Sequence, residues 1–216
     1  MRFIDRNDAG RQLAAKLLHL GDRNPVVLAL PRGGVPVGYE VARVLDAPLD
    51  IVLVRKIGVP WQPELALGAV TDGADPEVFI DRNLANELDI PEEYITSETH
   101  RQVEELERRR SVYGAGREPL DIAGRTAIVV DDGIATGATM RVALQATRRR
   151  NPSWLVLATP VAAPDTLDRL RPEADEVVCV ETPSGLGAIG FFYRDFHQVK
   201  DAEVTDLLAR AAQPAE

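Results

Sequence analysis

The stretch that decides the fold lies past the middle of the 216-residue chain and reads Val129-Val130-Asp131-Asp132-Gly133-Ile134-Ala135-Thr136-Gly137-Ala138-Thr139. With the apolar residues from Ala127 onward, its start forms a continuous apolar run, typical of a strand that a parallel sheet buries on both faces. Two acids follow, then a loop of small residues that opens a helical segment. Ligands of open parallel sheets bind beyond the carboxyl ends of the strands, so Asp131 and Asp132 are expected to face a ligand.

The loop from Gly133 to Thr139 has the composition of an anion site. Its side chains are small except Ile134, so backbone N–H groups can approach a phosphate, with the Thr136 and Thr139 hydroxyls as further donors and a helix N-terminus behind them. The two acids would repel a phosphate unless they meet ribose hydroxyls or Mg²⁺. The pattern therefore indicates a sugar phosphate with free vicinal hydroxyls. A Gly-x-x-x-x-Gly-Lys-Ser/Thr loop is absent from the sequence, which argues against an ordinary ATPase.

Strand-like runs and helical segments alternate along most of the chain. Strands are expected at Val26–Leu30, Asp50–Val54, Thr126–Val130, Trp154–Ala158 and Glu176–Val180. Helices are expected at Asp8–Leu20, Val35–Leu45, Gly137–Arg150, Pro164–Leu170 and Ala202–Ala212. This order predicts a single α/β domain over residues 1–216, built on an open parallel sheet flanked by helices. Two more short strands are predicted at Leu65–Val70 and Glu77–Ile80, with a turn at Asp72-Gly73.

Residues 81–116 differ in character, because acidic and basic side chains alternate there and apolar positions are sparse. Glu104 and Arg108 stand four residues apart, as do Glu105 and Arg109, with the acid N-terminal in each pair. This spacing predicts a long polar helix inserted into the domain. It is either a solvated surface helix or a lid or dimer arm.

Composition limits the partners and the compartment. The formal charge of −9 disfavours a general nucleic-acid binder, which needs a basic surface. The charged N-terminus lacks an apolar signal core, and the apolar runs are too short to span a bilayer. The single Cys179 cannot form an internal disulfide. These features predict a cytoplasmic protein with neither a nucleic-acid nor a membrane partner.

Residues Ala127 to Thr139 resemble the thirteen-residue signature of the type I phosphoribosyltransferases, and the α/β order is similar from about Val26 to Val180. The resemblance implies an Mg²⁺-dependent transferase that moves 5-phosphoribosyl from phosphoribosyl diphosphate to a nucleobase or related acceptor and releases pyrophosphate. It implies that Asp131 and Asp132 bind the ribose hydroxyls and contact Mg²⁺, directly or indirectly. The residues that would hold the ribose 5-phosphate with these acids are Gly133, Ala135, Thr136, Gly137, Ala138 and Thr139.

The leaving pyrophosphate gains charge as its bond breaks, so it needs cations or N–H donors beside it. The segment Pro31-Arg32-Gly33-Gly34 resembles the family's first loop, and its glycines let backbone N–H groups face an anion. We expect a strained or cis peptide near Arg32–Gly33. The family also places basic residues after the next strand. This resemblance implies that Arg55 and Lys56 bind pyrophosphate and that they are catalytic residues together with Asp131 and Asp132.

The pyrophosphate prediction extends to the residues that follow Lys56. Residues Ile57–Pro63 would form a mobile loop. Trp61 would be either a lid residue in that loop or a packing residue.

The acceptor side is predicted less sharply. A hood is expected at residues 181–198, where Phe191, Phe192 and Tyr193 either stack on a base or pack in the core. Hypoxanthine-guanine members carry an aspartate where this chain has Ala135, so that subclass is disfavoured and the acceptor stays open. Two other functions also stay open: a non-catalytic regulator that senses phosphoribosyl diphosphate or nucleotides through the same fold, and a phosphate-sugar hydrolase that uses the Asp pair around a metal. A homodimer stays open too, since family members are commonly dimers.

Overall fold

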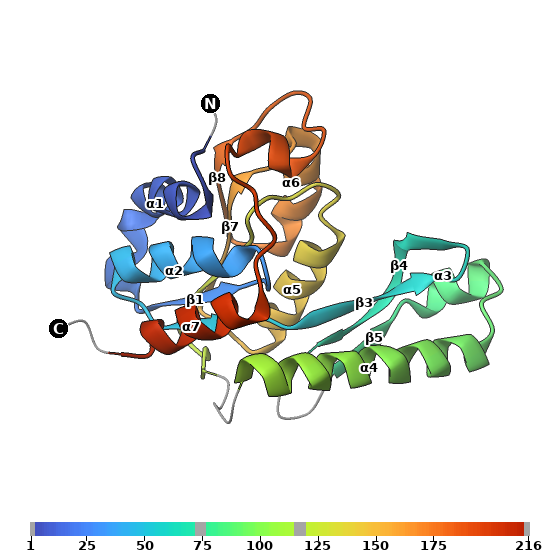
Figure 1. Ribbon diagram of the computed structural model, residues 1–216. Coiled ribbons are helices and arrows are strands. Elements are labelled where there is room, and N and C mark those ends of the chain that lie inside the picture. Colours follow the sequence, from blue (N-terminus) through green and yellow to red (C-terminus); the bar gives the residue numbers. More distant parts are fainter. Residues whose placement is uncertain (1–2, 72–76, 115–119, 214–216) are drawn as a thin grey trace. The chain divides into compact units, whose positions relative to one another are not determined.

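The computed structural model describes residues 3–71, 77–114 and 120–213. The chain divides into two compact units, one of residues Met1–Val52 with Leu120–Glu216 and one of residues Leu53–Pro119. Figure 1 shows a sheet with helices in the first unit and strands beside a long helix in the second. The second unit begins at Leu53, so it is larger than the insertion of residues 81–116 that the charge pattern predicts.

A five-stranded parallel sheet forms the centre of the first unit, in the order β2-β1-β6-β7-β8. Its strands are β1 (Pro25–Ala29), β2 (Leu49–Ile51), β6 (Thr126–Val130), β7 (Trp154–Val161) and β8 (Glu176–Glu181). Every residue of β1 and β6 is buried, as their continuous apolar runs predict. The predicted α/β fold with an open parallel sheet is confirmed.

Helices cover both faces of this sheet (Figure 1). They are α1 (Arg6–Leu17), α2 (Gly34–Leu45), α5 (Ala138–Arg149), α6 (Pro164–Leu170) and α7 (Asp201–Ala211), with 3-10 turns η1 (Leu18–Arg23), η2 (Arg171–Glu173) and η3 (Ile189–Phe192). The crossover through α2 runs from β1 to β2, whereas those through α5 and α6 run the opposite way along the sheet. Because such crossovers are right-handed, α2 lies on one face and α5 and α6 on the other. Helices α1 and α7 contact α2 and therefore share its face.

The second unit contains a three-stranded antiparallel sheet in the order β3-β4-β5. Its elements are β3 (Val54–Val59), β4 (Gln62–Thr71), β5 (Glu77–Ile80), α3 (Arg82–Glu87) and α4 (Glu92–Gly114). The two predicted short strands are therefore present, and the turn predicted at Asp72-Gly73 lies outside the described residues. The prediction of a loop over Ile57–Pro63 is wrong, because β3 runs to Val59 and β4 begins at Gln62, where a hairpin joins them.

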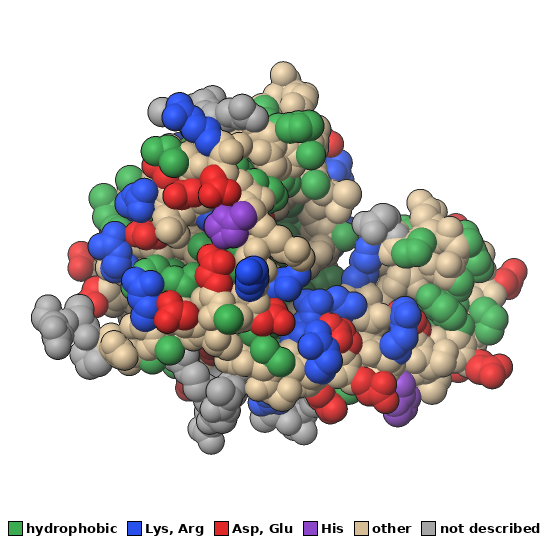
Figure 2. Space-filling view, viewed as in Figure 1, with side chains coloured by type: hydrophobic (Ala, Val, Ile, Leu, Met, Phe, Trp, Pro, Cys, Tyr) green, Lys and Arg blue, Asp and Glu red, His purple; other side chains and the backbone are tan. Residues whose placement is uncertain are grey.

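Helix α4 is amphipathic rather than polar all round. It packs on β3 and β4, and Ile95, Leu106 and Tyr113 are buried. On its outer side one of the two predicted pairs is present, with Arg109 Nε 2.8 Å from Glu105 Oε1. Arg108 also bonds to Glu105, and the two guanidinium groups lower the pKa of Glu105 to about 2. Figure 2 shows acidic and basic side chains mixed over this helix, which suits a solvated face.

Candidate active site

The site predicted from the sequence lies at the point where the strand order of the parallel sheet reverses. Strands β1 and β6 are neighbours, with Ala29 opposite Val130, and the chain leaves them in opposite directions along the sheet. The pairing continues past β1, because Leu30 N donates to Val130 O at 2.8 Å. The carboxyl ends of these two strands are therefore at the usual ligand position in open α/β sheets.

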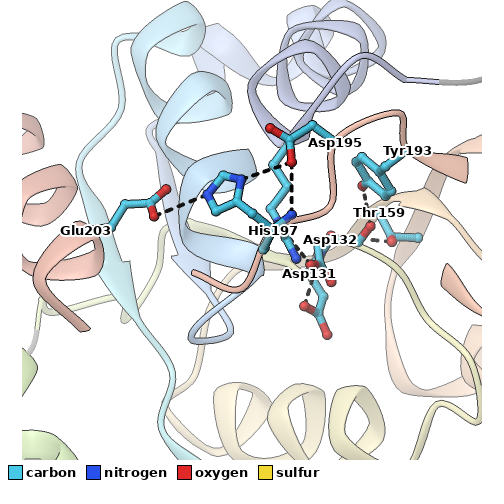
Figure 3. Close-up of polar contacts among 8 residues, drawn as sticks. Asp131, Asp132, Thr159, Tyr193, Asp195, His197 and Glu203 are labelled. Atoms are coloured by element: carbon cyan, nitrogen blue, oxygen red, sulfur yellow. Dashed lines mark hydrogen bonds and ion pairs between the residues drawn. The ribbon is translucent and has the colours of Figure 1, made fainter. Parts of the chain in front are cut away.

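Two adjacent carboxylates occupy the end of β6. Asp131 Oδ1 accepts from the backbone N–H of Asp132 at 2.8 Å, and Asp132 Oδ2 accepts from Arg6 Nε at 2.7 Å. Figure 3 shows the two acids side by side. Burial, followed by the negative charge of Asp132, raises the pKa of Asp131 well above its ordinary value. Burial also raises the pKa of Asp132, although the Arg6 charge opposes that shift. The pair thus favours a cation or hydroxyl donors.

The loop after β1 packs directly against these acids. A Cβ atom on Gly33 would lie 2.1 Å from Asp132 Oδ2, and one on Gly34 would lie 2.7 Å from Val130 O. A cis peptide joins Pro31 to Arg32, one bond before the place where the sequence indicated it. The structure therefore brings the predicted first loop and the predicted acids together, and glycine is required because no side chain fits between them.

The small-residue loop after the acids contains the buried residue Ile134, followed by residues 135–139, which we call the crest. Ile134 is buried, and its N–H donates to Val161 O at 2.9 Å. Ala135, Thr136 and Thr139 are exposed, and Thr166 Oγ1 donates to Ala135 O at 2.9 Å, fixing the base of the crest.

Gly137 has a φ of 82° and stands at the N-cap of α5. The first-turn N–H groups of a helix lack intrahelical acceptors, so those of α5 can meet an anion.

The predicted hood separates into exposed and buried aromatic residues. Phe191 is 67% exposed and Phe192 is half-buried, whereas Tyr193 is 2% exposed. The Tyr193 ring centroid lies 5.3 Å from that of Phe3 and 4.9 Å from that of Phe196. Of the two roles open to Tyr193, the structure therefore assigns core packing. Its hydroxyl donates to Asp132 O at 2.5 Å (Figure 3), so the hood is bonded to the acidic segment.

Arg6 is a site residue that the sequence did not reveal. It stands in the first turn of α1, yet its guanidinium reaches Asp132, which is 126 positions away in the chain. Cations are unfavourable at a helix N-terminus, and this is the signal that could have singled Arg6 out. No local sequence pattern identifies Asp132 as the partner of Arg6, because the ion pair depends on the packing of α1 beside the sheet.

Arg55 and Lys56 belong to the second unit. The sequence placed them at the carboxyl end of a strand over Asp50–Val54, but β2 ends at Ile51 and both residues lie in β3. Two separate strands replace the one expected there. Arg55 Nε donates to Gln102 Oε1 of α4 at 2.8 Å. Burial and then the nearby Arg109 charge lower the pKa of Arg55, as expected for a cation held among protein groups.

A cavity of about 560 Å³ opens beside Lys56 within the second unit. Lys56 lines it together with Tyr94, Glu98, Arg101 and Gln102. Trp61 is 64% exposed and therefore does not pack in the interior of this unit.

Comparison with known proteins settles the family. The sequence model described as "Phosphoribosyl transferase domain" matches residues 78–192, which is more than half of the chain. The chain belongs to this family. The resemblance found in the sequence is thereby confirmed, and the strand-end acids Asp131 and Asp132 lie within the matched residues.

Two curated relatives of this chain come from Mycobacterium tuberculosis, strains CDC 1551 and H37Rv. Each is named "Putative phosphoribosyl transferase" and is 46% identical over 209 residues, covering 97% of this chain and 47% of the relative. The chain thus spans about half the length of the curated relatives it matches. The crystal structure of TT1426 from Thermus thermophilus matches with a TM-score of 0.89 at 43% identity, over 99% of this chain and 100% of that one.

The described residues have neither a cluster of metal-ligating side chains nor a helix that could span a membrane. Within residues 3–71, 77–114 and 120–213, no three His, Cys, Asp or Glu side chains gather as a metal cluster. Among the same residues, no helix is both long enough and apolar enough to cross a membrane. The two strand-end acids suit Mg²⁺ nonetheless, since this ion takes one or two carboxylates and completes its shell with water and substrate oxygens.

Proposed function

We propose that this chain transfers the 5-phosphoribosyl group of phosphoribosyl diphosphate to a nucleobase or a related acceptor, with release of pyrophosphate. The observation that carries the proposal is the meeting of three parts at the ends of β1 and β6. These are the glycines at residues 33–34, the adjacent acids Asp131 and Asp132, and the crest that leads into α5. Each part matches the chemistry of one part of that donor.

The acids serve the ribose. Each carboxylate can accept hydrogen bonds from the vicinal 2′ and 3′ hydroxyls of a sugar that lies at the open end of the sheet. The raised pKa of Asp131 makes an added cation favourable, because burial and Asp132 both disfavour its charged form. Mg²⁺, held by Asp131 and Asp132 directly or through water, would neutralise charge on the donor's phosphate oxygens.

The crest serves the 5′-phosphate. Residues 135–139 combine the Thr136 and Thr139 hydroxyls with the N-terminus of α5. Backbone N–H groups and the helix dipole favour a dianion there. The methyl group of Ala135 leaves no acid to bind a purine N7, which disfavours a hypoxanthine-guanine acceptor.

The pyrophosphate is assigned to N–H groups and cations. Gly33 offers a backbone N–H group beside the acids, whereas the Gly34 N–H donates to Leu30 O at 3.0 Å, and Arg32 adds a half-exposed guanidinium. The family resemblance adds the positive charges of Arg55 and Lys56, which belong to the second unit. Stabilising the charge that grows on the leaving group, with the donor held in position, accounts for catalysis without a covalent enzyme intermediate.

The acceptor would lie under the hood. Phe191, which is 67% exposed, and the half-buried Phe192 are the candidate stacking residues. Stacking of a base on an aromatic ring is worth about 1–3 kcal/mol and tolerates many bases. The proposed acceptor class is therefore broad, and its identity has to come from a substrate panel.

Two measurements test the proposal. Calorimetry with phosphoribosyl diphosphate and Mg²⁺ should detect binding, and the double variant Asp131→Asn with Asp132→Asn should lose most of it. Pyrophosphate release across a panel of purine and pyrimidine bases should then identify an acceptor. Absence of binding to the wild-type chain would refute the proposal. Binding without turnover on every base would refute the transferase and favour the non-catalytic sensor.

A further inference from the structure

Arg6 is held by three different contacts at the edge of the proposed donor site. Its Nε donates to Asp132 Oδ2 at 2.7 Å, and its Nη1 donates to the backbone carbonyl of His197 at 2.8 Å. Its guanidinium carbon lies 3.9 Å from the centroid of the Phe196 ring. The residue is 8% exposed, so these contacts replace water around the charge. A planar fork fixed in this way defines where the carboxylate of Asp132 can point.

The partners of Arg6 belong to the proposed hood. Phe196 and His197 follow Tyr193, whose hydroxyl donates to the carbonyl of Asp132 at 2.5 Å. Asp132 is therefore tied to the hood twice, through its backbone and through its carboxylate. The ring of His197 takes no part, since it lies between Asp195 and Glu203 at 3.3 Å and 3.5 Å on the surface (Figure 3).

The two acids are not equivalent in this arrangement. Asp132 has a guanidinium counter-charge and lies against Gly33, whereas the carboxylate of Asp131 accepts a backbone N–H of its own segment. A buried ion pair of this kind does little for stability compared with apolar packing, so its value has to be sought in orientation.

We infer that Arg6 is a positioning residue for the donor site and acts through Asp132. It holds the Asp132 carboxylate in one orientation against Gly33 and links it to the hood segment 193–197. The inference rests on the proposed function, because the orientation matters for the ribose of phosphoribosyl diphosphate. Arg6 itself is too buried to bind a phosphate group of the donor directly.

A double-mutant cycle isolates this role. The affinity for phosphoribosyl diphosphate with Mg²⁺ is measured by calorimetry for the wild type, Arg6→Gln, Asp132→Asn and the combined variant. Loss of an outer-shell partner commonly weakens binding by about 10- to 100-fold, and we expect that loss for Arg6→Gln alone. In the Asp132→Asn background the same substitution should change affinity by less than about threefold, because the group it positions is gone.

Two further variants serve as a conservative replacement of Arg6 and as a control on the same helix. Arg6→Lys keeps the charge but lacks the fork, so we expect an affinity between those of the wild type and Arg6→Gln. It also replaces Arg6→Gln in the cycle if the latter does not fold. Arg11→Gln is the matched control on the same helix, since Arg11 is half-exposed and its Nη1 lies 3.6 Å from Glu40 Oε1; donor affinity should not change.

The outcomes distinguish a failure of the positioning role of Arg6 from a failure of the proposed function. Wild-type affinity in Arg6→Gln, or an equally large loss in both backgrounds, overturns the positioning role and leaves the proposed function intact. Such additive losses would mean that Arg6 acts on the donor by itself or on the fold alone. A wild-type chain that does not bind phosphoribosyl diphosphate removes the proposed function and this inference together.

Discussion

Gly33 and Asp132 are packed so closely that a Cβ atom on Gly33 would lie 2.1 Å from Oδ2 of Asp132. The contact joins the loop after β1 to the acids after β6, two segments that lie far apart in the chain. Gly33 has φ −62° and ψ −33°, an ordinary conformation for any residue. The requirement for glycine therefore comes from the neighbouring carboxylate and not from the backbone angles.

This contact predicts the effect of Gly33→Ala. The added methyl group must displace the Asp132 carboxylate, and we expect a loss of about 1–3 kcal/mol in the free energy of unfolding together with weaker binding of phosphoribosyl diphosphate. Urea unfolding and calorimetry measure the two effects. Gly21→Ala is the control, because a Cβ atom there meets no atom within 4 Å. Equal stability and equal affinity of the two variants would contradict the prediction.

The elements on both sides of this contact could be predicted from the sequence. Val26–Leu30 and Thr126–Val130 are continuous apolar runs, and such runs mark strands buried on both faces. The acids and the glycines follow those runs directly, so their place at the strand ends is also predictable. The pairing of β1 with β6 then brings them together.

Other parts of the site depend on contacts that no local pattern encodes. Arg6 meets Asp132 across 126 positions, and the Tyr193 hydroxyl meets the Asp132 carbonyl across 61. The position of Arg55 differs from the predicted one for another reason. The run over Asp50–Val54 has the pattern of one strand, but strand β2 of the parallel sheet ends at Ile51, and β3 begins the second sheet at Val54.

The hydroxyl of Tyr193 provides a second prediction. Burial and then the charge of Asp132 raise the pKa of Tyr193, so the hydroxyl remains a hydrogen-bond donor. Tyr193→Phe keeps the ring beside Phe3 but leaves the Asp132 carbonyl without this donor. We expect the free energy of unfolding to fall by about 1–3 kcal/mol in urea titrations. Tyr39→Phe, whose ring lies under Arg210, should change it by less than about 0.5 kcal/mol; a similar loss in both variants would argue against a special role for the hydroxyl.

A third prediction concerns the reactivity of Cys179. Burial raises the pKa of its thiol to about 11, and Sγ lies 3.2 Å from Glu181 O. The thiolate is the reactive form, so at about pH 8 the folded protein should react with iodoacetamide on the order of 100-fold more slowly than a free cysteine. Intact-mass measurements over time, in buffer and in denaturant, give the two rates. Equal rates would show that the thiol is not protected in the folded chain.

The last prediction is that Asp131→Asn stabilises the free protein while it weakens donor binding. Burial and Asp132 raise the pKa of Asp131 in the folded state, so the folded chain binds a proton that the unfolded chain has already released. Stability of the wild type therefore falls as the pH rises from the unfolded pKa, near about 4, through the folded pKa, and stays low above it.

Asparagine keeps the acceptor for the Asp132 N–H and removes this titration. We expect Asp131→Asn to be more stable than the wild type at about pH 7 by roughly 1 kcal/mol, the size of a typical stabilising substitution. Below about pH 4 the difference should vanish, because both forms of residue 131 are then neutral. Urea midpoints across this range, without ligand, measure it. The exposed Asp165→Asn serves as control, and a stability gain of Asp131→Asn that persists unchanged at low pH would exclude the carboxylate charge as its cause.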